Sequence, residues 1–110
     1  MFLRHLALAM LFMLSAMSAS ASDYYVIINN QTGYTINYVY ISPGKAKNWE
    51  EDVLGDKVLP HGSTQRVNLN GYASPIFDIR LVDEEGDTYT FWDVDVSEQD
   101  LLVTLDDIDE

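Results

Sequence analysis

The segment 83–87 reads DEEGD, and carboxylate oxygens are the ligands that Ca²⁺ prefers in proteins. An EF-hand calcium loop places oxygen ligands at positions one, three and five, glycine at position six and glutamate at position twelve. When Gly86 is set at position six, Leu81 falls at position one and Trp92 at position twelve. Both ends then lack a ligand, so the segment is not an EF-hand loop.

Two interpretations of this acidic segment remain open. In the first, Asp83, Glu85 and Asp87 join backbone carbonyls in an irregular calcium site with oxygens at about 2.4 Å. In the second, the segment is the solvated tip of a β-hairpin, and Gly86 supplies the positive φ that the turn requires. We expect the hairpin tip and keep calcium binding as its second role.

Patterns that would support catalysis or zinc binding are weak elsewhere in the chain. Asp93 and Asp95 are two residues apart on an expected strand, but a glycosidase-type pair also needs a cleft and one desolvated acid. His61 lies in a Pro-His-Gly turn, and the chain has no cysteine. Zinc needs three or four ligands and a catalytic triad needs a placed nucleophile. We therefore expect a protein that is not an enzyme.

The aromatic residues suggest recognition instead. Seven tyrosines exceed what a core this small can bury with every hydroxyl hydrogen-bonded, so some must be exposed. Exposed tyrosine beside tryptophan is typical of a surface that binds a protein or a carbohydrate, whereas half-buried tyrosines outside a sheet are the ordinary alternative. The candidate interaction surface consists of Tyr38, Tyr40, Trp49, Tyr72 and Trp92.

The charge distribution indicates the chemistry of a partner. The formal net charge is −12, and residues 78–110 contain thirteen acids against one base, Arg80. Such a surface repels nucleic acid and anionic lipid and attracts cations or a basic protein. An acidic surface also improves solubility, so both interpretations stay open.

Residues 1–21 predict export. Arg4 precedes an apolar run over residues 6–14, and small residues ending at Ala21 follow, which is the pattern of a signal peptide cleaved after Ala21. The run is shorter than the roughly 20 residues that a membrane-spanning helix needs. We expect residues 22–110 to form one periplasmic or secreted domain, monomeric and without a membrane span.

The apolar residues of this domain mostly recur with period two between Gly, Asn and Pro, which predicts an antiparallel all-β fold. We expect a small β-sandwich of six to seven strands. The clearest strands cover residues 24–28, 34–42, 64–69, 76–82, 88–94 and 101–105. Residues 106–110 are expected to form a frayed acidic tail.

Two local features interrupt this strand pattern. Ile36, Val39 and Ile41 can share one face only if a β-bulge lies near Asn37 or Tyr38. Residues 49–54 are expected to form a short helix, because a residue that can cap a helix precedes them and a glycine that can end one follows them.

Four motifs run through the chain: N-x-T-G-Y-T-I at 30–36, S-P at 42–43, W-x-x-D-x-L-G at 49–55, and D-I-R-x-V at 78–82 before the acidic glycine turn. In this order they resemble a family of small exported, uncharacterised bacterial proteins. The resemblance implies an exported β-rich domain rather than a reaction. Some members carry the label argininosuccinate lyase, but such lyases are large helical tetramers with a Gly-Ser-Ser loop, and this chain has neither the length nor the loop.

The chain departs from this family at two positions. Many relatives pair two cysteines at positions that hold Pro75 and Ser97 here. The missing cross-link is worth about 2–4 kcal/mol, and a bound cation could compensate for its loss.

Together these features predict an acidic β-sandwich of the cell envelope that acts as a non-enzymatic binding module for a basic envelope or secreted protein. A calcium-binding or calcium-stabilised domain is the alternative, and a hydrolase or lyase is the third hypothesis.

Overall fold

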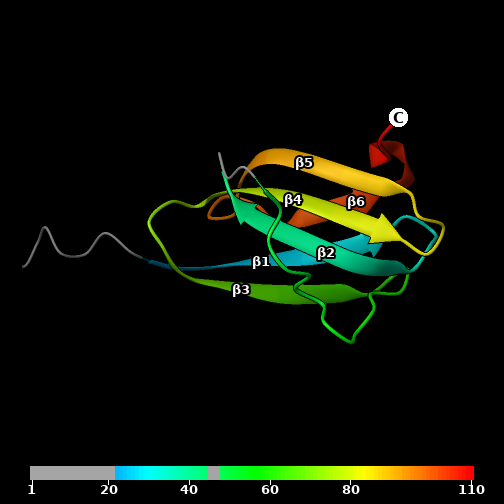
Figure 1. The fold of residues 1–110 in the computed structure, drawn as a ribbon, viewed down its shortest axis with the longest axis horizontal. Coiled ribbons are helices and arrows are strands. Elements are labelled where there is room, and N and C mark those ends of the chain that lie inside the picture. The colour runs from blue at the N-terminus through cyan, green and yellow to red at the C-terminus, as the bar shows by residue number, and fades with distance from the viewer. Residues whose placement is uncertain (1–21, 45–47) are drawn as a thin grey trace, which may run out of the picture.

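The computed structural model describes residues 22–44 and 48–110, and the predictions made for residues 1–21 lie outside them. The strands are β1 (Ser22–Gln31), β2 (Ile36–Pro43), β3 (Thr64–Tyr72), β4 (Ile76–Asp83), β5 (Thr88–Asp95) and β6 (Leu101–Thr104), followed by one 3-10 turn, η1 (Leu105–Asp107). They form two three-stranded sheets in the orders β3-β1-β6 and β2-β4-β5 (Figure 1). The predicted all-β fold is confirmed, with six strands.

The core consists of the inward-facing side chains of both sheets. Within β4, Phe77, Ile79 and Leu81 lie two residues apart, share the face of the strand that points to the core, and are at most 1% exposed. Val67 and Leu69 of β3 are also buried. Within the part of the chain that the structure describes, no helix is long and apolar enough to cross a membrane.

A β-bulge sets which side chains of β2 face the core. Ile36, Val39 and Ile41 are all buried, although strict alternation would turn one of them outward. The pairing of β2 with β4 shifts between Ile36 and Tyr38, which confirms the predicted bulge. Because Val39 points inward, its neighbours Tyr38 and Tyr40 point to the outer face of the sheet.

The predicted helix over residues 49–54 is absent, so that prediction was wrong. The segment runs along the edge of β2 instead: Tyr40 bridges Asp52, and Val53 N donates to Val39 O at 2.8 Å. Asp52 Oδ1 accepts hydrogen bonds from Val39 N at 2.8 Å and Leu54 N at 3.1 Å. These contacts satisfy the backbone of β2, and they outweigh the local helical preference of the segment.

The predicted frayed tail was also wrong. After η1, Ile108 bridges Tyr89 of β5, and Asp109 N donates to Thr88 O at 2.8 Å. The C-terminal residues therefore lie along the edge of β5 (Figure 1).

A buried asparagine holds the loops at one end of the sandwich. Asn30 is fully buried, and its Nδ2 donates to Tyr34 O at 2.7 Å and Leu59 O at 2.8 Å. Its Oδ1 accepts from Thr32 N at 3.0 Å and Thr32 Oγ1 at 2.7 Å. Since buried polar groups must be hydrogen-bonded, this one side chain fixes the loop after β1 and the approach to β3.

Candidate functional site

The acidic segment 83–87 is the tip of the β4–β5 hairpin, as one of the two interpretations predicted. β4 and β5 pair antiparallel, Asp83 N donates to Asp87 O at 2.9 Å, and Gly86 N donates to Asp83 O at 3.0 Å. Gly86 has φ of 83°, a conformation that glycine adopts without a steric penalty.

Asp83 is directed into the protein rather than into solvent. The residue is 2% exposed, and its Oδ1 accepts from Glu85 N at 2.9 Å and Asp87 N at 3.0 Å. Its Oδ2 accepts from the Tyr89 hydroxyl at 2.8 Å. Burial raises the pKa of Tyr89 far above its usual range, and the Asp83 carboxylate raises it further, so the hydroxyl stays protonated and donates. Both carboxylate oxygens of Asp83 are therefore engaged by donors of the protein itself.

The other acids of the turn do not join Asp83. Glu84 docks the hairpin on the loop before β2: its Oε2 accepts from Thr35 N at 2.7 Å, and its N donates to Thr35 O at 2.8 Å. Glu85 and Asp87 are exposed on the outside of the turn.

The predicted calcium ligands Asp83, Glu85 and Asp87 are thus not brought together. Among residues 22–44 and 48–110, no group of three or more His, Cys, Asp or Glu side chains is placed to hold a metal ion. The sequence could not reveal this, because only burial distinguishes Asp83 from its acidic neighbours. The geometry favours a structural role for the turn.

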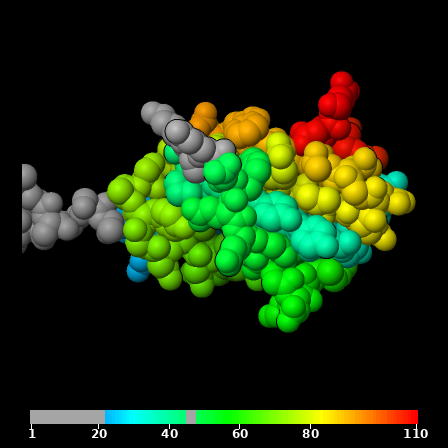
Figure 2. Space-filling model, in the orientation of Figure 1, coloured from blue at the N-terminus to red at the C-terminus, as the bar shows by residue number. Residues whose placement is uncertain are grey.

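The outer face of sheet β2-β4-β5 carries most of the candidate aromatic residues. Tyr38 and Tyr40 of β2 lie nearly parallel, with ring centroids 6.3 Å apart. Trp49, from the segment beside β2, contacts Trp92 of β5 at a centroid distance of 5.7 Å. We call these four residues and Arg80 the aromatic face. Figure 2 views the molecule from this side, where β2, β4 and β5 lie at the front.

Arg80 of β4 links the two halves of the aromatic face. It is the cross-strand neighbour of Tyr40, and its guanidinium carbon lies 4.9 Å from the centre of the Trp49 ring. This cation–π contact holds both side chains in place. The sequence did not identify Arg80 as part of the surface, although its alternation with buried Ile79 and Leu81 was the available signal.

Tyr72 lies apart from the aromatic face. It ends β3 in the other sheet and packs edge-on against Phe77, with ring centroids 5.0 Å apart at 86°. The predicted surface is therefore assembled without it.

A hydrogen-bonded acid lies at the β5 side of the aromatic face. Arg80 Nε donates to Thr90 Oγ1 at 3.0 Å, and Thr90 Oγ1 donates to Asp109 Oδ2 at 2.6 Å. Thr88 Oγ1 donates to the same oxygen at 2.7 Å. Burial acts to raise the pKa of Asp109, but the bonds from Thr90 and Thr88 outweigh it and hold the pKa below its ordinary value of 3.8.

His61 and Asp95 have local structural partners. His61 Nδ1 accepts from Gly33 N at 2.9 Å, which ties together the turns at residues 32–34 and 60–63. Asp95 Oδ1 accepts from Ser97 N at 3.0 Å and Ser97 Oγ at 2.6 Å. These contacts place each side chain in a turn or strand end rather than in a cleft.

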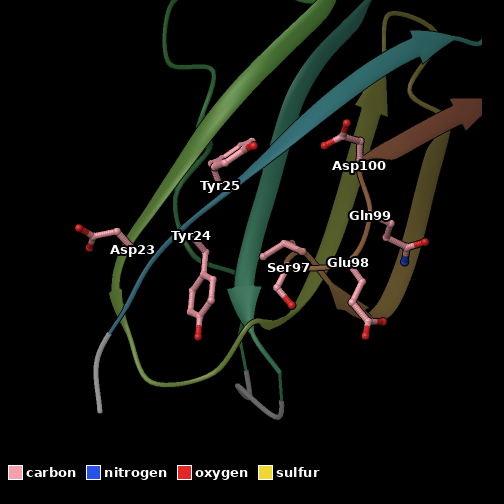
Figure 3. A pocket seen from close by; sticks show the side chains of 8 residues that line it. Asp23, Tyr24, Tyr25, Ser97, Glu98, Gln99 and Asp100 are labelled. Atoms are coloured by element: carbon pink, nitrogen blue, oxygen red, sulfur yellow. The ribbon is translucent and has the colours of Figure 1, made fainter. Parts of the chain in front are cut away.

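A hollow of about 300 Å³ lies between the start of β1 and the β5–β6 connection. Its lining includes Asp23, Glu98 and Asp100 beside two tyrosines. Figure 3 shows that these three carboxylates point in different directions, and Asp23 Oδ1 accepts from Gly71 N at 3.2 Å. The arrangement offers neither a nucleophile with a base nor converging cation ligands.

No protein-family model, curated protein or solved structure matches the chain.

Replacing Asp83 with alanine is expected to lower the free energy of unfolding by about 3 kcal/mol, because two backbone N–H groups and the Tyr89 hydroxyl lose their acceptor inside the protein. Asp87→Ala, on the same turn but exposed, should change it by less than about 0.5 kcal/mol. Urea unfolding in chelator and in calcium measures both. If the two variants lost equal stability, and only when calcium was present, the turn would be a metal site after all.

Asp109 should make stability depend on pH. The pKa of Asp109 is lower in the folded state than in the unfolded state, where it is near 3.8. The ionised carboxylate therefore stabilises the fold at pH values above 3.8, and this stabilisation is lost as the pH falls through the folded-state pKa. Asp109→Asn is therefore expected to lower the urea midpoint at neutral pH, by an amount that shrinks in acid. Glu110→Gln, also exposed, is the matched control. If the urea midpoint of Asp109→Asn stayed below that of the unaltered protein by the same amount down to about pH 2, Asp109 would not be the source of the pH dependence.

Proposed function

We propose that the protein is a non-enzymatic binding module of the cell envelope that binds a basic protein through the aromatic face. The observation that carries the proposal is the exposure of large aromatic rings on one sheet face: Trp92 is 62% exposed and Tyr38 is 48% exposed. Tyr38 contacts Tyr40 and Trp92 contacts Trp49, and Arg80 lies next to both of these partners.

The composition of the aromatic face suits binding. Tryptophan, tyrosine and arginine are the residues most often found where truncation costs a complex most of its affinity. Large rings bury much apolar area when a partner covers them. Trp49 and Arg80 already stack on each other, and Trp49 contacts Trp92, so binding would order few additional side chains.

The charge around the aromatic face favours a basic partner. Asp109 lies at its β5 side, and exposed Glu50 and Glu51 follow Trp49 at its β2 side. The net charge of −12 would accelerate association with a basic protein and oppose binding of nucleic acid or anionic lipid. The signal-peptide pattern of residues 1–21 and the resemblance to exported proteins support an envelope or secreted partner.

The calcium alternative has less support from the described contacts. Of the three predicted ligands, Asp83 is engaged inside the protein and only the exposed carboxylates of Glu85 and Asp87 remain, whereas calcium ordinarily takes six to eight oxygen ligands.

Trp92→Ala and Tyr38→Ala are each expected to weaken capture of a basic protein from an envelope extract by about tenfold or more, since central aromatic residues often contribute 2 kcal/mol or more. Leu102→Ala is the matched control, because Leu102 is 55% exposed but belongs to β6 in the other sheet. Affinity is measured by surface plasmon resonance at low and moderate salt, and folding by the melting temperature. An equal loss of affinity in the Leu102→Ala variant, or capture of acidic instead of basic proteins, would contradict the proposal.

A further inference from the structure

The edge of β3 differs from the other strand edges of the sandwich. The outer edge of β2 is covered by residues 52–59, and the edge of β5 pairs with Ile108 and Asp109. β6 has only four residues. β3 has nine residues, and within the described chain its backbone pairs with β1 alone. Long open edges are normally covered or blocked, because their unpaired backbone groups invite another strand.

The register shows which backbone groups of β3 are available. Asn30 N donates to Ser63 O at 3.0 Å, so those two residues face each other across the ladder. In an antiparallel ladder every second residue pair is hydrogen-bonded. Counting from Ser63, the next residues of β3 that turn their N–H and C=O groups toward β1 are therefore Gln65 and Val67. The backbone groups of Arg66 and Asn68 then point to the open edge. The side chain of Gln65 donates to Arg66 O at 3.0 Å, which agrees with that orientation.

A hollow of about 480 Å³ runs beside this edge. Its apolar lining comes from both sheets and includes Ile41, Val53, Leu69 and Tyr72. Its opposite wall carries Glu50, Glu51 and Asp52, and none of its described lining residues is basic. The one base of β3, Arg66, lies over the Tyr25 ring at 3.9 Å on the outer face of the sheet.

We infer that this hollow and the open edge of β3 bind an extended basic peptide segment of a partner. The segment adds to β3 as a fourth strand of sheet β3-β1-β6. Backbone hydrogen bonds to Arg66 and Asn68 provide the pairing, as in other complexes formed by strand addition. Lysine or arginine at alternate positions of the peptide would lay its apolar stem over Val53 and Leu69 and extend its charged end toward Glu50 and Glu51.

Charge selects this occupant over a second copy of the chain. Two copies paired edge to edge through β3 would bring together two chains that each carry a net charge of −12. The site borders the aromatic face, because Glu50 and Glu51 of its wall directly follow Trp49. Its backbone pairing with β3 uses none of the aromatic residues, so Asn68 variants test this inference and Trp92 variants test the proposed function.

The test is a selection of random nine-residue peptides on phage against the folded full chain. We expect enriched peptides to carry lysine or arginine at alternate positions. Asn68→Pro should weaken the binding of such a peptide about tenfold or more, because it removes an outward N–H while leaving the pairing with β1 intact. Asn68→Thr keeps the N–H and should bind as before, and Trp92→Ala should also leave binding unchanged.

Amide hydrogen exchange on the unaltered protein provides a second readout should the proline variant unfold. Saturating peptide should slow exchange at Asn68 N–H about tenfold or more, while Val67 N–H, already turned toward β1, should change little. Selection of acidic peptides or of none, equal binding to the proline variant, unchanged exchange at Asn68, or a β3-to-β3 dimer that excludes peptide would each overturn the inference.

Discussion

The buried carboxylate of Asp83 determines how one end of this sandwich closes. An ionised group removed from water is tolerated only when hydrogen bonds replace its hydration. Here two turn amides and the Tyr89 hydroxyl do so, which fixes the β4–β5 turn and places a large ring in the core. Beside it, Glu84 holds the loop at Thr35. In a chain without cysteine, these polar contacts provide part of the order that a disulfide often gives small exported domains.

The same chemistry recurs along the chain and explains part of its acidity. Asp52 accepts from Val39 N, Asp78 accepts from Asp93 N, and Asp107 accepts from Thr104 N. The contact to Asp78 is the most consequential, because it lies where the pairing of β4 with β5 shifts between Phe77 and Ile79. Asp93 has φ of 54° at this bulge, and Trp92 beside it is turned to solvent. Carboxylates that accept hydrogen bonds from backbone N–H groups thus help to shape the aromatic face. The bulge in β2 turns Tyr38 and Tyr40 toward this face.

The sequence predicted what depends on neighbouring residues. Alternation located the six strands, glycine marked the hairpin turn, and the conflict among Ile36, Val39 and Ile41 required the bulge in β2. The sequence did not predict what depends on residues far apart in the chain. The cap signals at 49–54 indicated a helix, but the edge of β2 recruited that segment. Similarly, strand order alone decides that Tyr40 and Arg80 are neighbours and that Tyr72 belongs to the other sheet. The four acids of the hairpin looked alike until packing buried one of them.

The most direct test of the account is site-specific photocrosslinking in cells that produce the protein, with a photoreactive phenylalanine analogue in place of Trp92 or, as the control, of Leu102. Both positions are exposed, but they lie on different sheets. If the aromatic face is the binding surface, position 92 will form an adduct with a basic protein that position 102 does not form. The same adducts from both positions, or none from position 92, would contradict it.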